Sequence, residues 1–177
     1  KELIENYYPA DFICEGIDQT RGWFYSLMAI STFTLGKAPY KNVLVNDLVV
    51  DKNGQKMSKS RGNTLDPFAL FDKYGADAVR FYSLYVSPAW MQTKFDEAGL
   101  VEVRNNFFRT YENVYNFFSL YANTDGLSVE DLQNIGKVEL EKIDKWLYSR
   151  LNTLVKNYYQ EMEVFEYNKV VHLISDF

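Results

Sequence analysis

The sequence has little cysteine or histidine. Of its 177 residues, only Cys14 carries a thiol and only His172 carries an imidazole. A single cysteine excludes a disulfide within the chain and any zinc site built from several cysteines, and it fits a cytosolic setting. The chain also lacks Asn-X-Ser/Thr glycosylation acceptors.

Long apolar runs are absent as well. The longest uncharged stretch covers residues 22–36, and it contains several serine, threonine and glycine residues. A membrane-spanning helix needs about 20 predominantly apolar residues, so we exclude a membrane function. The net charge of −5 argues against a protein that holds nucleic acid through bulk positive charge. Any anion site must therefore be local.

Hydrophobic and aromatic residues, in contrast, are plentiful. They make up 47% and 17% of the chain, which indicates a real core. The length allows one domain or a little more than one. Residues 1–94 hold 11 basic and 10 acidic side chains, whereas residues 96–177 hold 8 and 14. This change near residue 95, together with a start at Lys1 and an end inside an apolar segment, predicts a fragment with two parts.

The first part predicts an α/β layer. Residues 11–15 suggest a short strand, and Asp18 is a plausible N-cap for the next helix. That helix, 19–35, is apolar nearly all round, so we expect it to be buried on most faces. Residues 43–50 are rich in valine and predict a second strand, and Asn-Gly at 53–54 is the turn signal of a hairpin.

Helical patterns then continue to the end of the chain. Pro67 and Gly75 are expected to begin and end one helix, and a second follows over 76–86. Beyond residue 95 the apolar residues recur only at helical spacing. They predict helices over 107–121, 140–162 and 167–174, which we expect to form an antiparallel bundle. The predicted fold class is thus α/β followed by all-α.

The densest polar signal is a cluster of basic residues and hydroxyls. It consists of Lys52, Lys56, Lys59 and Arg61, with Ser58 and Ser60 between them. Two lysines three residues apart, just after a tight turn, can place two ammonium groups on one phosphate chain. A basic turn that is simply solvated is the commoner situation, so composition alone does not decide between the two.

A second group of polar residues follows the first predicted strand. Glu15, Asp18 and Gln19 lie where the strand ends and the helix starts, the edge at which open α/β sheets bind ligands. Carboxylates repel phosphate, so these residues suit ribose hydroxyls or a substrate ammonium group. Trp23, one turn later, can wall an apolar pocket. The alternative for each residue alone is a helix cap, an exposed strand end or a core aromatic.

Together the two groups resemble class I aminoacyl-tRNA synthetases. Lys56-Met-Ser-Lys59-Ser60 matches the family's KMSKS signature, and the segment 15–24 resembles isoleucyl members in particular. Tyr74 to Asp77 with Arg80, and residues 144–149, resemble later parts of the same family. The family's His-Ile-Gly-His signature is absent, and His172 is expected to be an ordinary helix residue.

The resemblance implies a fold, an activity and partners. Residues 1–95 would be the C-terminal half of a Rossmann-like catalytic domain, and residues 96–177 the first helices of an anticodon-binding bundle. The parent enzyme would activate isoleucine with ATP and Mg²⁺ and transfer it to tRNA(Ile). A monomer in the cytoplasm is implied, and the isolated chain should be inactive because half of its ATP site is missing.

Roles for individual residues also come from the resemblance. Lys59 and Lys56 would act on the triphosphate and the leaving pyrophosphate, with Ser58 and Ser60 helping to hold the loop and bind ATP. The residues expected to contact the aminoacyl-adenylate are Glu15, Gly16, Asp18, Gln19 and Trp23, and no metal site is expected within the chain. Two alternatives stay open: a valyl or leucyl synthetase, and a non-catalytic binding module with a decayed synthetase fold.

Overall fold

The computed structural model describes residues 6–133 and 139–177. The chain divides into two compact units. The first comprises residues up to 65 together with 83–95, and the second comprises residues 66–82 together with 96–177.

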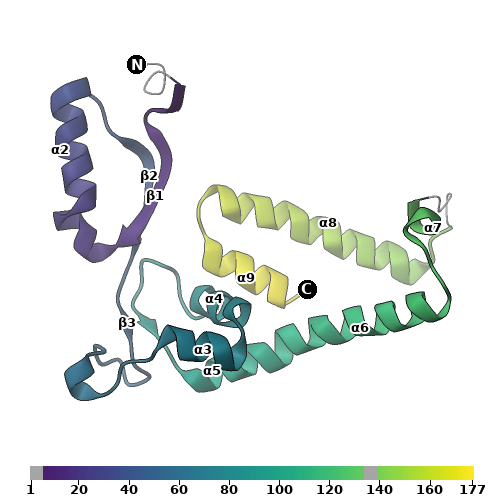
Figure 1. Cartoon of the computed structure of the whole chain (residues 1–177). Helices are drawn as coiled ribbons and strands as arrows, with labels where there is room; N and C mark the ends of the chain where they lie inside the picture. Colours follow the sequence, from purple (N-terminus) through teal and green to yellow (C-terminus); the bar gives the residue numbers. More distant parts are fainter. Residues whose placement is uncertain (1–5, 134–138) are drawn as a thin grey trace. The chain divides into compact units, whose positions relative to one another are not determined.

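The first unit is built on a pair of parallel strands (Figure 1). Strand β1 (Ala10–Gly16) pairs with β2 (Tyr40–Asn46), in a register that runs from Ala10 opposite Tyr40 to Gly16 opposite Asn46. A 3-10 turn, η1 (Ile17–Arg21), and helix α2 (Trp23–Leu35) connect the two strands. Parallel strands require a crossover of this kind, so the arrangement confirms the predicted strand–helix–strand order.

The predicted second strand is interrupted. After β2 the chain forms β3 (Val49–Val50), which pairs in parallel with β4 (Thr93–Lys94). Asp47 causes the change, because its backbone N–H donates to the Ala89 carbonyl at 2.8 Å rather than to β1. The turn at Gly54 has φ 77° as expected, but antiparallel pairing is limited to one bridge between Val50 and Lys56.

Two predictions about the crossover helix are wrong. Asp18 does not cap it, because Gly16 is the N-cap of η1 and α2 begins only at Trp23. The helix is also not buried on most faces: only Phe24 and Ser31 are buried, while Phe33 is 92% exposed. Helix α2 has apolar side chains on nearly all sides, but the described residues pack against only one side of the helix.

The second unit is helical. It contains α3 (Pro67–Tyr74), most of α4 (Ala76–Tyr85), α5 (Glu97–Val103), a π-helical turn η3 (Arg104–Phe108), α6 (Arg109–Thr124), α7 (Val129–Gln133), α8 (Lys142–Glu163) and α9 (Tyr167–Ser175). Side-chain caps fix several starts. Asp66 accepts from the Phe68 N–H at 3.0 Å, and Asp96 accepts from the Ala98 N–H at 3.1 Å. The predicted start of α3 at Pro67 is confirmed.

The core of the second unit lies where α4 meets α5. Leu100 is fully buried, and Tyr82 is 5% exposed. A Cβ on Gly99 would come within 2.5 Å of the Tyr82 hydroxyl, so glycine allows this close approach. Burial raises the pKa of Tyr82, which keeps its hydroxyl neutral.

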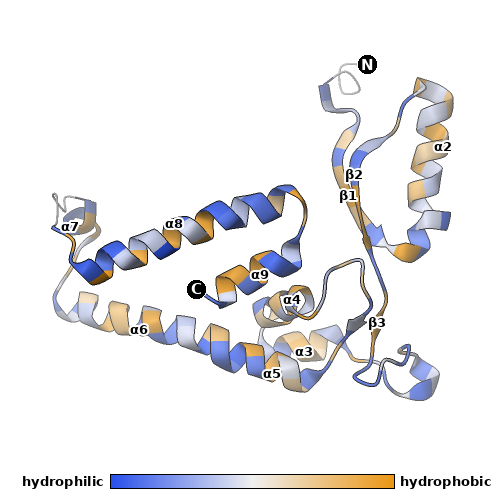
Figure 2. Ribbon diagram, turned by 180° about the vertical axis from the view of Figure 1, so that it is seen from behind, coloured by the Kyte–Doolittle hydropathy of each residue, from blue (hydrophilic) through white to orange (hydrophobic). Residues whose placement is uncertain are grey.

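The later helices expose much of their apolar surface. Helices α8 and α9 lie side by side (Figure 1), and Val170 and Val171 of α9 are buried. Along α6 and α8, however, hydrophobic residues recur without cover (Figure 2), as Phe117 and Ile143 illustrate at 66% and 65% exposure. The helices were thus predicted correctly, whereas a closed bundle is not formed by the described residues. None of the described helices is both long enough and apolar enough to cross a membrane.

Candidate functional site

The lysine loop, defined here as residues 51–63, is organised around the Asp51 carboxylate. One oxygen, Oδ1, accepts from the backbone N–H groups of Asn53 at 2.9 Å and Gln55 at 2.8 Å. The other oxygen, Oδ2, accepts from the side-chain amide of Asn63 at 2.9 Å. These contacts lower the pKa of Asp51 below its usual value, the bond from Asn63 contributing most. Asp51 is therefore the ionised centre of the loop.

Asn63 links this centre to the signature lysines. Its side-chain Oδ1 accepts from the Ser58 N–H at 2.9 Å, and its Nδ2 also donates to the Lys56 carbonyl at 3.4 Å. The amide thus holds the backbone on both sides of Met57. Asp51, Ser58 and Asn63 are half-buried.

The two signature lysines themselves are exposed. Lys59 begins a short 3-10 turn, η2 (Lys59–Arg61), which Gly62 ends in the left-handed region at φ 64°. The Ser58 and Ser60 hydroxyls lie 3.2 Å apart. The loop is mostly hydrophilic (Figure 2), with Met57 as its large apolar residue. Its backbone is held from inside while Lys56 and Lys59 point their charge at solvent, an arrangement suited to a polyanionic ligand.

The second predicted group, the glutamate corner (residues 15–23), has a smaller network. Gln19 donates to Asp18 Oδ2 at 2.9 Å and accepts the Trp23 N–H through Oε1 at 2.9 Å. A Cβ on Gly16 would lie 2.7 Å from the Asp18 carboxylate, so glycine lets Asp18 fold back here. Glu15 is exposed, and Trp23 is 45% exposed. The structure thus brings Asp18, Gln19 and the Trp23 backbone together.

The glutamate corner and the lysine loop belong to the same compact unit. Glu15 and Gly16 end β1 opposite Val45 and Asn46 of β2, the strand that leads through β3 into the lysine loop. Both groups therefore follow the carboxyl ends of the parallel strands. Within the described ranges, no hydrogen bond or ion pair joins one group directly to the other. A shared cleft between them stays a prediction.

The second unit has a polar cavity of about 720 Å³. Its walls come from the α3–α4 junction and from the η3–α6 segment, and its cationic side chains include Arg104 and Arg109. Neither arginine forms an ion pair among the described residues, whereas Lys73 is paired with Glu97 at 2.7 Å. Asn105 and Asn113 add amide groups to the lining. Asp72, Asp77 and Glu112 also line it, so the cavity presents both guanidinium and carboxylate groups.

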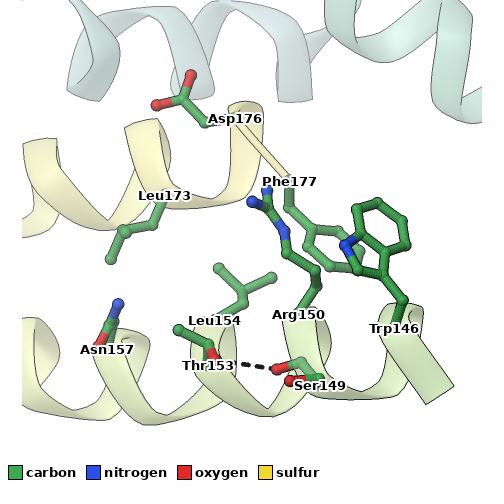
Figure 3. A pocket seen from close by; sticks show the side chains of 9 residues that line it. All are labelled: Trp146, Ser149, Arg150, Thr153, Leu154, Asn157, Leu173, Asp176 and Phe177. Carbon is green, nitrogen blue, oxygen red and sulfur yellow. Dashed lines mark hydrogen bonds between the residues drawn. The ribbon is translucent and has the colours of Figure 1, made fainter.

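A smaller cavity of about 310 Å³ lies between α8 and α9 (Figure 3). The Arg150 guanidinium lies over the Trp146 ring at 5.9 Å, and Leu154 faces Leu173 across the space. None of the predicted site residues lines this cavity. His172 lies in α9, as expected for an ordinary helix residue. Within the part of the chain that the structure describes, no three His, Cys, Asp or Glu side chains gather to hold a metal ion.

Sequence reasoning missed the structural role of Asp51 and Asn63. The sequence analysis gave no role to either residue. The signal for Asp51 was present, because an Asp at the start of a turn that contains Asn-Gly, as in Asp51-Lys52-Asn53-Gly54, commonly accepts from the backbone of its own turn. The pairing with Asn63, twelve residues later, had no local signal.

Comparison with known proteins places these features in a family. The description "tRNA synthetases class I (I, L, M and V)" matches residues 1–96, more than half of the chain. The chain therefore belongs to the class I tRNA synthetase family, as its signature residues predicted.

Within that family, similar relatives are isoleucine–tRNA ligases. The chain is 48% identical over its whole length to an isoleucine–tRNA ligase of Bacteroides fragilis and 46% identical to one of Cytophaga hutchinsonii. Isoleucine–tRNA ligase 2 of Bacillus cereus is 45% identical over 99% of the chain. The chain spans 16% to 17% of the length of these relatives.

Solved structures show the same fold. A Mycobacterium tuberculosis methionyl-tRNA synthetase in complex with methionyl-adenylate matches 99% of this chain with a TM-score of 0.76 at 22% identity, and the match covers 33% of that chain. A ternary complex of an Agrobacterium radiobacter LeuRS with tRNA and LeuAMS matches with a TM-score of 0.74 at 21% identity, covering 99% of this chain and 22% of that chain.

Proposed function

We propose that this chain is the signature-loop segment of an isoleucine–tRNA ligase, which joins isoleucine to tRNA(Ile) at the expense of ATP. The observation that carries the proposal is the lysine loop, whose internal hydrogen bonds leave Lys56 and Lys59 free to bind a polyphosphate. The identity of 48% to an isoleucine–tRNA ligase over the whole chain supports isoleucine over valine or leucine. A decayed binding module is disfavoured because the signature lysines, Glu15 and Gln19 are all present.

In the proposed first step, a carboxylate oxygen of isoleucine attacks the α-phosphorus of ATP. The bond from that phosphorus to the bridging oxygen breaks, and pyrophosphate leaves with the bond's electron pair. The carboxylate is already ionised at neutral pH, so the site needs positioned positive charge and no general base. Lys59 and Lys56 supply that charge to the triphosphate, which arrives as its Mg²⁺ complex, and Ser58 and Ser60 help to hold the loop.

The glutamate corner is assigned to the other end of the adenylate. The carboxylates of Glu15 and Asp18 suit the ribose hydroxyls or the substrate ammonium group, and Gln19 can both donate and accept. Trp23 would form a wall of the side-chain pocket. A solved structure of the same fold is a complex with methionyl-adenylate, which supports the assignment. In the second step, a terminal ribose hydroxyl of tRNA attacks the acyl carbon, loses its proton and displaces AMP.

The domain division is proposed on the same grounds. Residues 1–95 would be the C-terminal part of a Rossmann-like catalytic domain, a placement supported by the family match to residues 1–96. Residues 96–177 would begin the helical anticodon-binding domain, whose further helices would cover the apolar faces of α6 and α8. The longer relatives have ample chain for this purpose. A monomer in the cytoplasm stays a prediction.

A tRNA-binding face is proposed for the second unit. With a net charge of −6 over residues 96–177, most of its surface should repel RNA. The wall of the polar cavity formed by Arg104 and Arg109 is the exception, since neither arginine forms an ion pair among the described residues, although Asp72, Asp77 and Glu112 line other parts of the cavity. We assign these two arginines to RNA phosphates.

The experiment that tests the proposed function is amino-acid-dependent pyrophosphate exchange by a full-length ligase that contains this segment. Isoleucine should be activated about 10-fold to 200-fold more efficiently than valine, since one methylene in an apolar pocket is worth about 1–3 kcal/mol; isoleucyl-tRNA synthetases are themselves the established example of this limit. Leucine should be a poor substrate. Equal activation of valine or leucine would overturn the isoleucine assignment, and exchange by the isolated 177-residue chain would overturn the expectation that it is inactive.

A further inference from the structure

The lysine loop contains a side-chain contact that spans its whole length. The Asn63 amide accepts from the Ser58 N–H through Oδ1 and donates to Asp51 Oδ2 through Nδ2, each at 2.9 Å. Asp51 in turn accepts from the backbone at Asn53 and Gln55. Two half-buried side chains thus tie the turn before the signature to the backbone within it.

We propose that Asp51 and Asn63 form a clasp that sets the internal shape of the lysine loop and thereby positions Lys56 and Lys59 for adenylate formation. This inference rests on the function proposed above for the two lysines. Asp51 and Asn63 are positioning residues, because they contact the loop backbone and leave the phosphates to the exposed ammonium groups. If the loop already has its final shape before ATP binds, the reaction does not have to supply the free energy needed to order it.

The clasp has a fixed hydrogen-bond direction. The Asp51 carboxylate can only accept, and the Ser58 N–H can only donate, so the residue between them must offer one donor and one acceptor. Asparagine at position 63 does this. Aspartate at position 63 would still accept from Ser58 but would place a second carboxylate against Asp51. Asparagine at position 51 would turn its own NH₂ donor toward the NH₂ donor of Asn63, so the two groups could not form a hydrogen bond. If the Asn63 amide rotated to offer its oxygen to position 51, its NH₂ group would face the Ser58 N–H, and that bond would be lost instead.

This direction makes a reciprocal exchange possible. In the double variant Asp51→Asn with Asn63→Asp, the new asparagine can donate to the new aspartate while its oxygen accepts from Asn53 and Gln55. The new aspartate can accept from both the new asparagine and Ser58. Net charge is unchanged, although the carboxylate moves from position 51 to position 63. The double variant therefore restores the bonds that join positions 51, 58 and 63, and it lacks only the 3.4 Å bond to the Lys56 carbonyl.

The test measures the single-turnover rate of adenylate formation at saturating ATP in a full-length ligase that contains this segment. Each single variant should be slower by about tenfold or more, and the double variant should return to within about threefold of the native rate. Isoleucine binding should change less than twofold throughout. Asn53→Asp is the matched control, because it adds the same charge to the same turn without a side-chain role in the clasp, and its rate should stay within twofold of native.

Hydrogen exchange at the Ser58 amide separates this inference from the proposed function. The amide should be protected in the native protein, less protected in Asn63→Asp, because repulsion from the Asp51 carboxylate draws the new carboxylate away from Ser58, and protected again in the double variant. Lys59→Ala should leave this protection unchanged while slowing the reaction. A double variant without restored protection overturns the clasp, and one with restored protection but a rate as slow as Asn63→Asp overturns its positioning role. A fast Lys59→Ala variant with the expected protection pattern overturns the proposed lysine function and leaves the clasp as a structural feature only.

Discussion

The two compact units differ in the surface features that they offer to a ligand. In the first unit, the family's signature groups occur on exposed loops at the carboxyl ends of parallel strands. In the second unit, a cavity of about 720 Å³ is lined mainly by polar side chains that lie outside the KMSKS signature. The first unit thus supplies chemical groups, and the second supplies a shaped polar surface.

This difference indicates how each unit depends on its surroundings. The lysine loop keeps its shape through contacts within thirteen residues, from Asp51 to Asn63. The apolar side of α2, with Phe33 and Ile30 exposed, has no such internal support and suits burial against further chain. The polar cavity is lined by residues of the second unit. Changes to the first unit should therefore affect chemistry, and changes to the cavity should affect RNA binding.

The largest effect is expected from Lys59→Ala in a full-length ligase that contains this segment. Removing a positioned charge from the phosphate site should slow adenylate formation by about 100-fold to 1,000-fold, while isoleucine binding changes little. Pre-steady-state pyrophosphate release and isoleucine titration measure the two quantities. Lys52→Ala is the matched control, since this lysine precedes the signature on the same loop. Equal losses in rate and isoleucine affinity would contradict the assigned role.

A smaller effect is expected from Glu15→Gln at the other signature corner. The variant loses a charge-assisted hydrogen bond to the substrate ammonium or the ribose, so kcat/KM for isoleucine activation should fall about tenfold to 100-fold. Asp11→Asn changes an exposed carboxylate on the same strand, which forms an ion pair with Lys41, and should have no effect on activation. If both variants behaved alike, Glu15 would be an ordinary strand end.

The comparison between the units is sharpened by replacing both Arg104 and Arg109 with alanine. Loss of two phosphate contacts should weaken tRNA binding about tenfold at physiological salt and reduce the salt dependence of the affinity. Isoleucine activation without tRNA should be unchanged. Arg150→Ala, which removes the guanidinium over Trp146, is the control. An unchanged salt dependence would show that the cavity does not meet RNA.

Local signals predicted much of the fold. The strand around Ile13, the start of α3 at Pro67 and the long helix α8 follow from patterns within a few residues. The exposure of α2 could not be predicted, because periodicity states which residues favour burial and says nothing about what covers them. The split of the predicted second strand depended on Ala89, more than forty residues later.

The candidate site was predictable in its residue types and less so in its geometry. Lys56 and Lys59 were found because the signature is contiguous. The Asn63 bond to Asp51 joins residues twelve apart in a loop without periodicity, so composition could not reveal it. The place of Arg104 and Arg109 in the polar cavity likewise emerged only from the packing of η3 and α6 beside the α3–α4 junction.

The smallest effect is expected from Glu97→Gln in the second unit. The Glu97 carboxylate accepts from Lys73 at 2.7 Å and also from the Tyr74 hydroxyl, and these bonds, the one from Lys73 first, hold the pKa of Glu97 below its usual 4.5. A lowered folded pKa means that the stabilisation is complete above the usual pKa and is lost as pH falls through the lowered value. Both side chains are largely exposed, so solvent screens the pair. The variant should lower the melting temperature by about 1–2 °C at pH 7, and the difference should vanish in strong acid. Thermal unfolding at several pH values measures it, with Glu102→Gln on the same helix as control; a difference that grew toward low pH would contradict the ion pair.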